Sequence, residues 1–392
     1  MKNMEISFIY DIPTKVFFGN DVEKLGEQVG IYGKKTLLIY DGDYVKKSGL
    51  FDRIVKQLNT NQIEIFEFTD VRANPRHTDI NKGVELCRAK QIDVIIAIGG
   101  GSVIDSAKTI GAAFYYNGDC WDIVSRKISS KRCLPVIAIS TISATGSEMD
   151  NAAVITNEKT KEKCVLAGQE LYPVAAFMEP KLTYTVSKKQ TACGIADIIS
   201  HVLEEYFTPQ AGLNMIDSVM EGLIRTMLYY GPIALEQPDN YEARANIMWS
   251  SVWAINGFIS FDRPHNWSMH PLGHELSAFY DLTHGVTLAI IMPRWLKHIK
   301  DEQSLPLFRK LGLYAFMLDP KLSSESMANE VILQLENLFY NELELPSSLS
   351  ELNISDEHFE EMANKLCKEN GYLNGYRKLN KKEILSIYQE CL

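Results

Sequence analysis

Short apolar runs alternate with amphipathic stretches through the first half of the chain. The runs are typical of strands buried on both faces and lie at 35–40, 64–68, 93–98 and 135–140. Apolar residues at helical spacing occupy the stretches at 20–30, 44–58 and 78–90. This regular alternation predicts parallel βαβ units and hence a doubly wound α/β sheet, with 153–156 and 175–178 as its last strands.

The pattern changes after Lys188, where longer stretches with a helical period take over. They lie at 188–230, 240–260, 268–280, 286–300, 303–317 and 324–342, with turn signals such as Gly231–Pro232 between them. A chain of 392 residues exceeds the roughly 250–300 residues at which a single core stops growing. We therefore predict an α/β domain over 1–187 and an all-helical domain over 188–392.

Composition narrows the classes of partner. The net charge is −10 and no Lys/Arg-rich block occurs, so neither nucleic acid nor an anionic membrane surface is expected as a partner. The seven cysteines are scattered and form no C-x-x-C pair, which favours a reduced compartment. Neither a signal peptide nor an apolar run near the ~18 residues of a membrane span is present, so a cytoplasmic protein is expected.

Two segments carry potential metal ligands. His270 and His274 are four residues apart and share a helix face, and His284 follows ten residues later. Upstream, Asp197 and His201 have the same spacing in an apolar context. A carboxylate with imidazoles suits Fe²⁺ or Zn²⁺, so we predict that the segments meet at one divalent metal. The alternative is a set of hydrogen-bonded core histidines or a surface pair.

A glycine-rich loop follows the most apolar strand. Gly99, Gly100, Gly101 and Ser102 stand where a strand leads into a helix, a position that suits a pyrophosphate. The loop is not the usual dinucleotide fingerprint, because Ile104 replaces its third glycine, and it lacks the spacing of a Walker A loop. A tight turn that binds nothing is the alternative.

Asp41 follows an earlier strand within Asp41–Gly–Asp43. A carboxylate at this place accepts hydrogen bonds from an adenosine ribose and repels a 2′-phosphate, which favours NAD over NADP. The alternative is an ordinary turn residue.

Together these stretches resemble the iron-containing (group III) alcohol dehydrogenase family, in particular its butanol dehydrogenase and aldehyde reductase branch. The resemblance rests on 13–19, Asn74–Pro75–Arg76, 99–108, 145–149, Gly194-x-x-Asp197-x-x-x-His201 and 270–284. It implies a dinucleotide-binding N-terminal domain, a metal-binding helical domain, a cleft between them, and short-chain aliphatic alcohols and aldehydes as substrates. The resemblance also favours a homodimer, as does the segment 5–18, which predicts two short strands around the Ile12–Pro13 break.

The resemblance also assigns roles to individual residues. The metal ligands would be Asp197, His201, His270 and His284. The pyrophosphate would lie on Gly99 to Ser102, the nicotinamide and its ribose near Thr141, Thr145, Ser147 and Lys163. His274 falls where the family has a nearby non-ligand histidine. Apart from the resemblance, His274 is the nearest titratable group that could relay a proton to the product oxygen, and the alternative is that it only orients the ligands. Asp105 on the helix after the loop is expected to help fix that loop, and the alternative is that it faces solvent. Asp41–Gly–Asp43 replaces a glycine-rich, serine-containing turn of the branch, so NAD is expected and NADP remains possible.

Three other functions compete with this one. A dehydroquinate synthase-like lyase would need several Arg and Lys for a phosphorylated substrate, whereas 250–295 holds two arginines and no lysine. In a metallohydrolase the order His270-x-x-x-His274–Glu275 is wrong for the H-E-x-x-H helix. A non-catalytic metal scaffold would not need the glycine loop.

Asp41→Gly tests the cofactor assignment. Removing the carboxylate removes its repulsion of a 2′-phosphate, so turnover with NADPH should rise relative to turnover with NADH. The ratio of kcat/KM for the two cofactors measures the effect, and an unchanged ratio would show that Asp41 does not contact the ribose.

Overall fold

A six-stranded parallel sheet forms the core of the N-terminal half. The computed structural model describes residues 8–208, 214–260 and 266–392. The strands follow the order β1-β8-β5-β4-β2-β3. They span β1 Lys15–Phe18, β2 Lys35–Tyr40, β3 Glu64–Phe68, β4 Val94–Gly99, β5 Val136–Ser140 and β8 Ala175–Met178. The predicted doubly wound α/β sheet is therefore confirmed.

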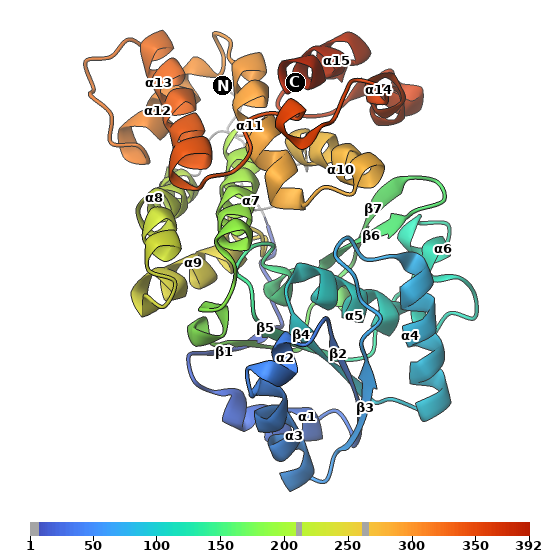
Figure 1. Cartoon of the computed structure of the whole chain (residues 1–392). Helices are drawn as coiled ribbons and strands as arrows, with labels where there is room; N and C mark the ends of the chain where they lie inside the picture. Colours follow the sequence, from blue (N-terminus) through green and yellow to red (C-terminus); the bar gives the residue numbers. More distant parts are fainter. Residues whose placement is uncertain (1–7, 209–213, 261–265) are drawn as a thin grey trace.

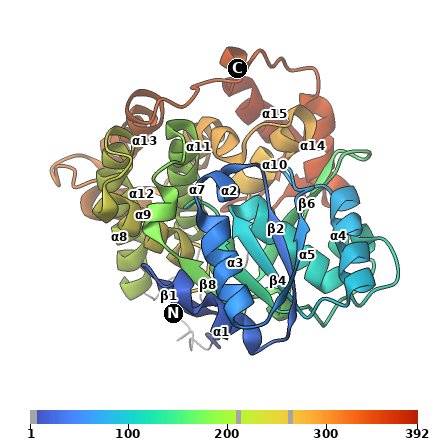
Figure 2. The same ribbon diagram turned by 60° about the horizontal axis from the view of Figure 1, so that its bottom comes forward.

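Helices cover both faces of this sheet (Figures 1 and 2). They are α1 Leu25–Gly30, α2 Tyr44–Lys47, α3 Leu50–Thr60, α4 His77–Lys90, α5 Gly101–Ala113 and α6 Cys120–Val124. Successive strand residues point to opposite faces, so in β4 the side chains of Ile96 and Ile98 pack with α1 and α3 while those of Ile95 and Ala97 pack with α4 and α5. Burial on both faces explains the continuous apolar runs in the sequence.

The carboxyl ends of β2, β4 and β5 form one edge of the sheet. Tyr40 pairs with Ile98, and Gly99 pairs with Ser140, so these three strands end together. The loops that follow them therefore lie side by side, at the edge where open α/β sheets bind their ligands.

Two details of the N-terminal half differ from the prediction. Residues 153–156 were expected in the main sheet but belong to β6 Ala152–Asn157, which pairs antiparallel with β7 Glu162–Ala167 in a separate hairpin. The Asn157 side chain stabilises the turn of this hairpin by accepting the backbone N–H groups of Lys159 and Thr160. Of the two strands expected in 5–18, only β1 forms among the described residues, because Pro13 interrupts the run, and 5–7 lie outside them.

The C-terminal half is built from helices (Figure 1). They are α7 Lys188–Tyr206, α8 Asn214–Glu236, α9 Tyr241–Trp253, α10 Met269–Tyr280, α11 His284–Ile299, α12 Leu305–Tyr314, α13 Ser324–Glu336, α14 Phe359–Cys367 and α15 Lys381–Glu390. A π-helical turn, η5 Asn337–Glu342, extends α13, and a minor strand pair joins β9 Tyr372–Leu373 to β10 Leu379–Asn380. Short 3-10 turns lie at η1 Val22–Lys24, η2 Ser147–Met149, η3 Gln169–Leu171, η4 Pro180–Thr183, η6 Ser350–Leu352 and η7 Lys368–Asn370.

Gly231–Pro232 does not separate helices, contrary to the prediction, because α8 runs through Pro232. A proline inside a helix costs about 3 kcal/mol. Packing against α7 outweighs this cost: the backbone of Gly231 approaches so closely that a Cβ there would lie 3.2 Å from Ile195 Cδ1. Within the described ranges no helix is long and apolar enough to cross a membrane.

Gly285→Ala tests the close approach of α11 to α7. A Cβ at Gly285 would lie 2.3 Å from the Cys193 carbonyl oxygen, so the two helices would have to separate. We expect the free energy of unfolding in urea to fall by about 1–3 kcal/mol. Gly222→Ala in α8 is the matched control, since a Cβ there meets nothing within 4 Å; equal destabilisation of both variants would contradict the packing argument.

Candidate metal centre and cofactor loop

Helix α7 carries the first two candidate ligands. The Ser187 side chain caps its start by accepting the Gln190 N–H at 3.2 Å, and residues 191–206 are buried around the whole circumference. Asp197 and His201 are one turn apart, 3% and 5% exposed. A carboxylate and an imidazole buried this deeply require partners.

Glu204, which the sequence analysis did not single out, positions the next ligand. Its side chain is fully buried, and its oxygens accept the backbone N–H groups of Ser268 at 3.1 Å and His270 at 2.8 Å, at the start of α10. The His270 Nδ1 lies 3.3 Å from Glu204 Oε1, which leaves Nε2 for a metal. Glu204 stands three residues after His201 on the same helix, and a glutamate within so apolar a stretch was the signal that could have identified it.

The candidate ligand atoms gather around Asp197 Oδ1. Asp197 Oδ1 lies 3.6 Å from His201 Nε2, 3.9 Å from His270 Nε2 and 3.5 Å from His284 Nε2. Four-coordinate ions with bonds of about 2.1 Å place their ligands about 3.4 Å apart, close to these spacings. Candidate atoms of Asp197, His201 and His270 also lie within 4.8 Å of one another. The structure thus brings Asp197, His201 and His270 together, and it places His284 Nε2 beside the Asp197 oxygen without including His284 in that set of three.

The electrostatics of this cluster fit a cation. Asp197 Oδ1 is buried and accepts no hydrogen bond, and burial raises the pKa of Asp197 to about 7 despite the nearby positive charge of Lys163. Burial also lowers the pKa of His270 to about 3 and the pKa values of His201 and His284 well below the usual range, with Lys163 adding to the effect on His270 and His284. Neutral imidazoles beside an orphaned carboxylate oxygen form a site that a divalent cation would satisfy.

His274 lies beside the cluster. Its ring centroid is 5.1 Å from that of His284 and 6.2 Å from that of His270. Burial, followed by the charge of Lys163, lowers its pKa well below the usual value, so its imidazole is neutral at pH 7. The His284 side chain is 22% exposed, more than those of His201 and His270, so this side of the cluster is its most open.

The glycine loop lies at the carboxyl edge of the sheet. Gly99 ends β4, Gly100 precedes α5, and Gly101 begins that helix, which places the N–H groups of its first turn at this edge. A Cβ at Gly101 would lie 2.5 Å from Thr145 Oγ1. Ser102 is partly exposed in the first turn of α5. This loop therefore has the features of a pyrophosphate cradle.

Buried polar groups support this loop from below. Asp105 accepts a hydrogen bond from the Ser147 hydroxyl at 2.6 Å and another from the Val154 N–H at 2.8 Å. Lys108 donates to the same hydroxyl at 2.9 Å and also pairs with Asp150. Asp105 and Ser147 thus tie α5 to the segment 147–154, and that Asp105 fixes the loop remains a prediction.

The remaining cofactor candidates surround the same edge. Asp41 is exposed directly after β2, and Thr141 follows β5 with its N–H bonded to the Gly99 carbonyl at 3.1 Å. Thr145 is partly exposed and accepts the Ser147 N–H at 3.2 Å. Lys163 projects from β7 and donates to the Asn74 side chain at 3.0 Å.

Gly194 lies where α7, which carries Asp197 and His201, packs against the loop after β5. A Cβ at this position of α7 would lie 2.2 Å from the Ser143 carbonyl oxygen in the loop after β5. Since Asp197 is less than one turn further along α7, the contact sets the distance between the ligand cluster and the carboxyl edge of the sheet.

His270→Ala tests the ligand assignment. It removes an imidazole from the cluster and leaves Asp197 with a weaker set of partners, so the metal bound per chain after refilling should fall to near zero. His298→Ala removes an imidazole from α11 that pairs with Glu383 at 3.7 Å, outside the cluster, and should retain the metal. Mass spectrometry of the bound metal measures both; full metal content in His270→Ala would refute the assignment.

Comparisons with known proteins identify the family of this chain. The family model for iron-containing alcohol dehydrogenases matches residues 13–180, and the model for the C-terminal part of the Fe-containing alcohol dehydrogenase family matches 191–392. NADH-dependent butanol dehydrogenase A of Clostridium acetobutylicum is 41% identical over 387 residues, covering 98% of this chain and 99% of that protein. The NADPH-dependent aldehyde reductase YqhD of Escherichia coli is 32% identical over 364 residues, covering 92% of each chain.

A solved structure is also similar to this chain in fold. The crystal structure of NADH-dependent butanol dehydrogenase A from Thermotoga maritima matches with a TM-score of 0.93 and 34% identity, covering 98% of each chain. Matches that span both halves, at more than 30% identity, leave one conclusion: the chain belongs to the iron-containing alcohol dehydrogenase family.

Proposed function

We propose that this enzyme interconverts short-chain aliphatic aldehydes and alcohols, using a divalent metal and NADH. One observation carries the proposal: the orphaned carboxylate oxygen of Asp197 faces three imidazoles in the helical half, and α7 is packed against the cofactor loops through Gly194. Relatives named as butanol dehydrogenases and as an aldehyde reductase support the substrate class.

The residues around the sheet edge would hold the nucleotide. Gly99, Gly100, Gly101 and Ser102 would bind the pyrophosphate through the first turn of α5. Thr141 and Thr145 lie next to this loop and would line the nicotinamide end, while Ser147 and Asp105 hold the loop in place from below. Lys163 would approach the nicotinamide ribose.

NADH is the proposed cofactor rather than NADPH. Asp41 is exposed beyond β2, next to the strand that carries the glycine loop, where its negative charge would repel a 2′-phosphate. Relatives of both kinds exist, since butanol dehydrogenases A and B of Clostridium acetobutylicum are named NADH-dependent and YqhD is named NADPH-dependent.

Asp197, His201, His270 and His284 would hold the metal. One carboxylate and three neutral imidazoles suit Fe²⁺ and Zn²⁺ alike. When bound, the cation supplies a Lewis acid for the substrate oxygen, and the reduced nicotinamide supplies the hydride.

His274 is the proposed proton relay. Reduction of an aldehyde adds a hydride to carbon and a proton to oxygen, and the proton must come from solvent through a nearby group. The neutral imidazole of His274 can donate a proton from one ring nitrogen while the other accepts a replacement. Its place beside His284, on the open side of the cluster, supports this role.

Three further expectations from the sequence belong to this proposal. The enzyme would act as a homodimer in the cytoplasm, and the division into domains over 1–187 and 188–392 would separate nucleotide binding from metal binding. Light scattering on the purified chain tests the dimer.

The activity is tested on protein stripped by chelation and refilled with Fe²⁺ or Zn²⁺. NADH oxidation with butyraldehyde should depend on the metal and exceed NADPH oxidation under the same conditions. His274→Ala should keep its metal and lower kcat about a hundredfold, because a positioned acid contributes 10²–10⁴. Absence of NAD(P)H oxidation with every straight-chain aldehyde would refute the proposed function, and an unchanged kcat in His274→Ala would refute the relay.

A further inference from the structure

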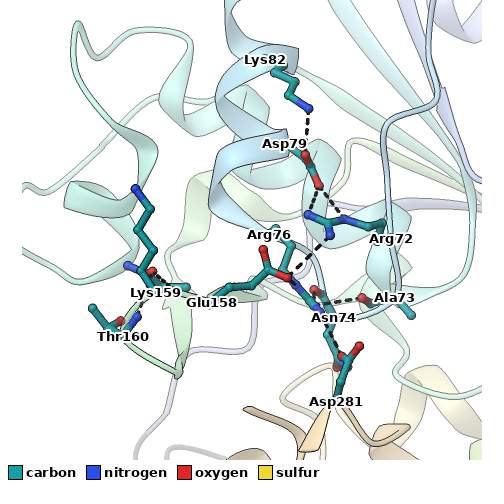
Figure 3. Close-up of polar contacts among 11 residues, drawn as sticks. Arg72, Ala73, Asn74, Arg76, Asp79, Lys82, Glu158, Lys159, Thr160 and Asp281 are labelled. Carbon is teal, nitrogen blue, oxygen red and sulfur yellow. Dashed lines mark hydrogen bonds and ion pairs between the residues drawn. The ribbon is translucent and has the colours of Figure 1, made fainter. Parts of the chain in front are cut away.

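A polar network joins the two halves of the chain (Figure 3). Its N-terminal members are Arg72, Asn74 and Arg76 after β3, Asp79 in α4 and Glu158 in the β6–β7 turn. One residue, Asp281, comes from the helical half. Asp281 Oδ1 accepts from Asn74 Nδ2 at 2.9 Å and from Arg76 Nη2 at 3.0 Å.

Asp281 lies in the turn that leads to His284, one of the proposed metal ligands. It ends α10 in a left-handed conformation, φ 52°, where the chain turns from α10 into α11. His284, the ligand at the open side of the cluster, begins α11 three residues later. A contact that holds Asp281 therefore limits the positions that His284 can adopt.

Asn74 connects this turn to the cofactor side. Its amide nitrogen donates to Asp281, while its side-chain oxygen accepts from Lys163 Nζ at 3.0 Å. One asparagine thus bridges a lysine of the α/β half and the turn that carries a metal ligand.

In the pair of Arg76 and Asp281, the arginine is the more firmly held partner. The Arg76 side chain is 8% exposed and is also held by Glu158 at 2.8 Å, whereas the Asp281 side chain is 68% exposed. Burial opposes ionisation of Asp281, but the hydrogen bonds from Asn74 and Arg76 outweigh it and lower its pKa. A pair with so exposed a partner adds at most about 1 kcal/mol, so breaking it should shift the position of Asp281 without unfolding the chain.

We propose that Asn74, Arg76 and Asp281 form a latch that positions His284 and Lys163 relative to each other. The latch fixes the open side of the metal cluster against the cofactor side of the sheet. Asn74, Arg76 and Asp281 are positioning residues for the reaction proposed above, and the inference rests on that function only for its effect on turnover.

A second contact holds the two halves together without Asn74, Arg76 or Asp281, so variants of these residues should not unfold the chain. Lys365 of α14 pairs with Glu275 of α10 at 3.2 Å and donates to the Lys161 carbonyl in the β6–β7 turn. The hairpin therefore remains attached to the helical half when the latch is broken.

Arg76→Met and Asp281→Gly break the latch from its two sides. Glycine suits position 281 because it accepts the left-handed φ without strain. Each variant should release its Zn²⁺ to a chelator about tenfold faster than the parent enzyme, as loss of residues that orient ligands does elsewhere. The double variant should be no faster than the worse single variant, because both remove the same contact.

Two variants serve as controls. Arg72→Met removes an arginine of the same network that pairs with Asp79 at 2.8 Å and Glu158 at 3.6 Å, without contact to Asp281 in the contacts described, and should release Zn²⁺ within about twofold of the parent rate. Asp281→Asn keeps the side-chain oxygen and tolerates the left-handed turn, so it should restore most of the retention lost in Asp281→Gly.

The thermal midpoint and the kinetics are measured alongside. A latch predicts faster release and lower kcat at a midpoint close to that of Arg72→Met. Parental release rates in both Arg76→Met and Asp281→Gly, or equal acceleration in Arg72→Met, would overturn the latch. Failure of the parent enzyme to reduce aldehydes would overturn the proposed function instead, since metal release is measured without turnover.

Discussion

The candidate metal centre is arranged around one buried oxygen that has no hydrogen-bond partner. Asp197 Oδ1 is buried among imidazole nitrogens with no hydrogen-bond donor, an arrangement whose free energy becomes favourable when a cation joins it. Three helices must come together to create it, and glycines at the contacts make this possible. Gly285 lets α11 approach α7, and Gly194 lets α7 approach the loop after β5. These two glycines thus allow the close packing that brings the candidate ligands together.

Residues around the cluster also position the candidate ligands through hydrogen bonds. Glu204 caps the start of α10 with the same carboxylate that faces His270 Nδ1, so the helix and the ring orientation are set together. Under the cofactor loop, Asp105 and Lys108 share the hydroxyl of Ser147. Both arrangements use a buried charged group to position a neighbour, and both satisfy that group's own need for partners.

A hydride can be transferred only if substrate oxygen, nicotinamide and proton source keep their spacing. In this chain the candidate metal ligands belong to the helical half and the glycine loop to the α/β half. Contacts between the halves therefore carry the geometry of the reaction. Gly194 provides one such contact near Asp197, and the polar network around Asp281 provides another near His284.

The sequence by itself predicted the α/β sheet followed by helices, and it singled out the candidate ligands. Its periodicities distinguish buried strands from helices, and the spacings of Asp197 with His201 and of His270 with His274 place each pair on one helix face. Only the tertiary structure decided what lies far apart in the chain: that Glu204 orients His270, that β6 leaves the main sheet, that α8 continues through Pro232, and that Asp281 meets Arg76. Local patterns report which face of an element is apolar, but not which element covers it, so contacts between distant segments and the tolerance of a proline are settled by packing.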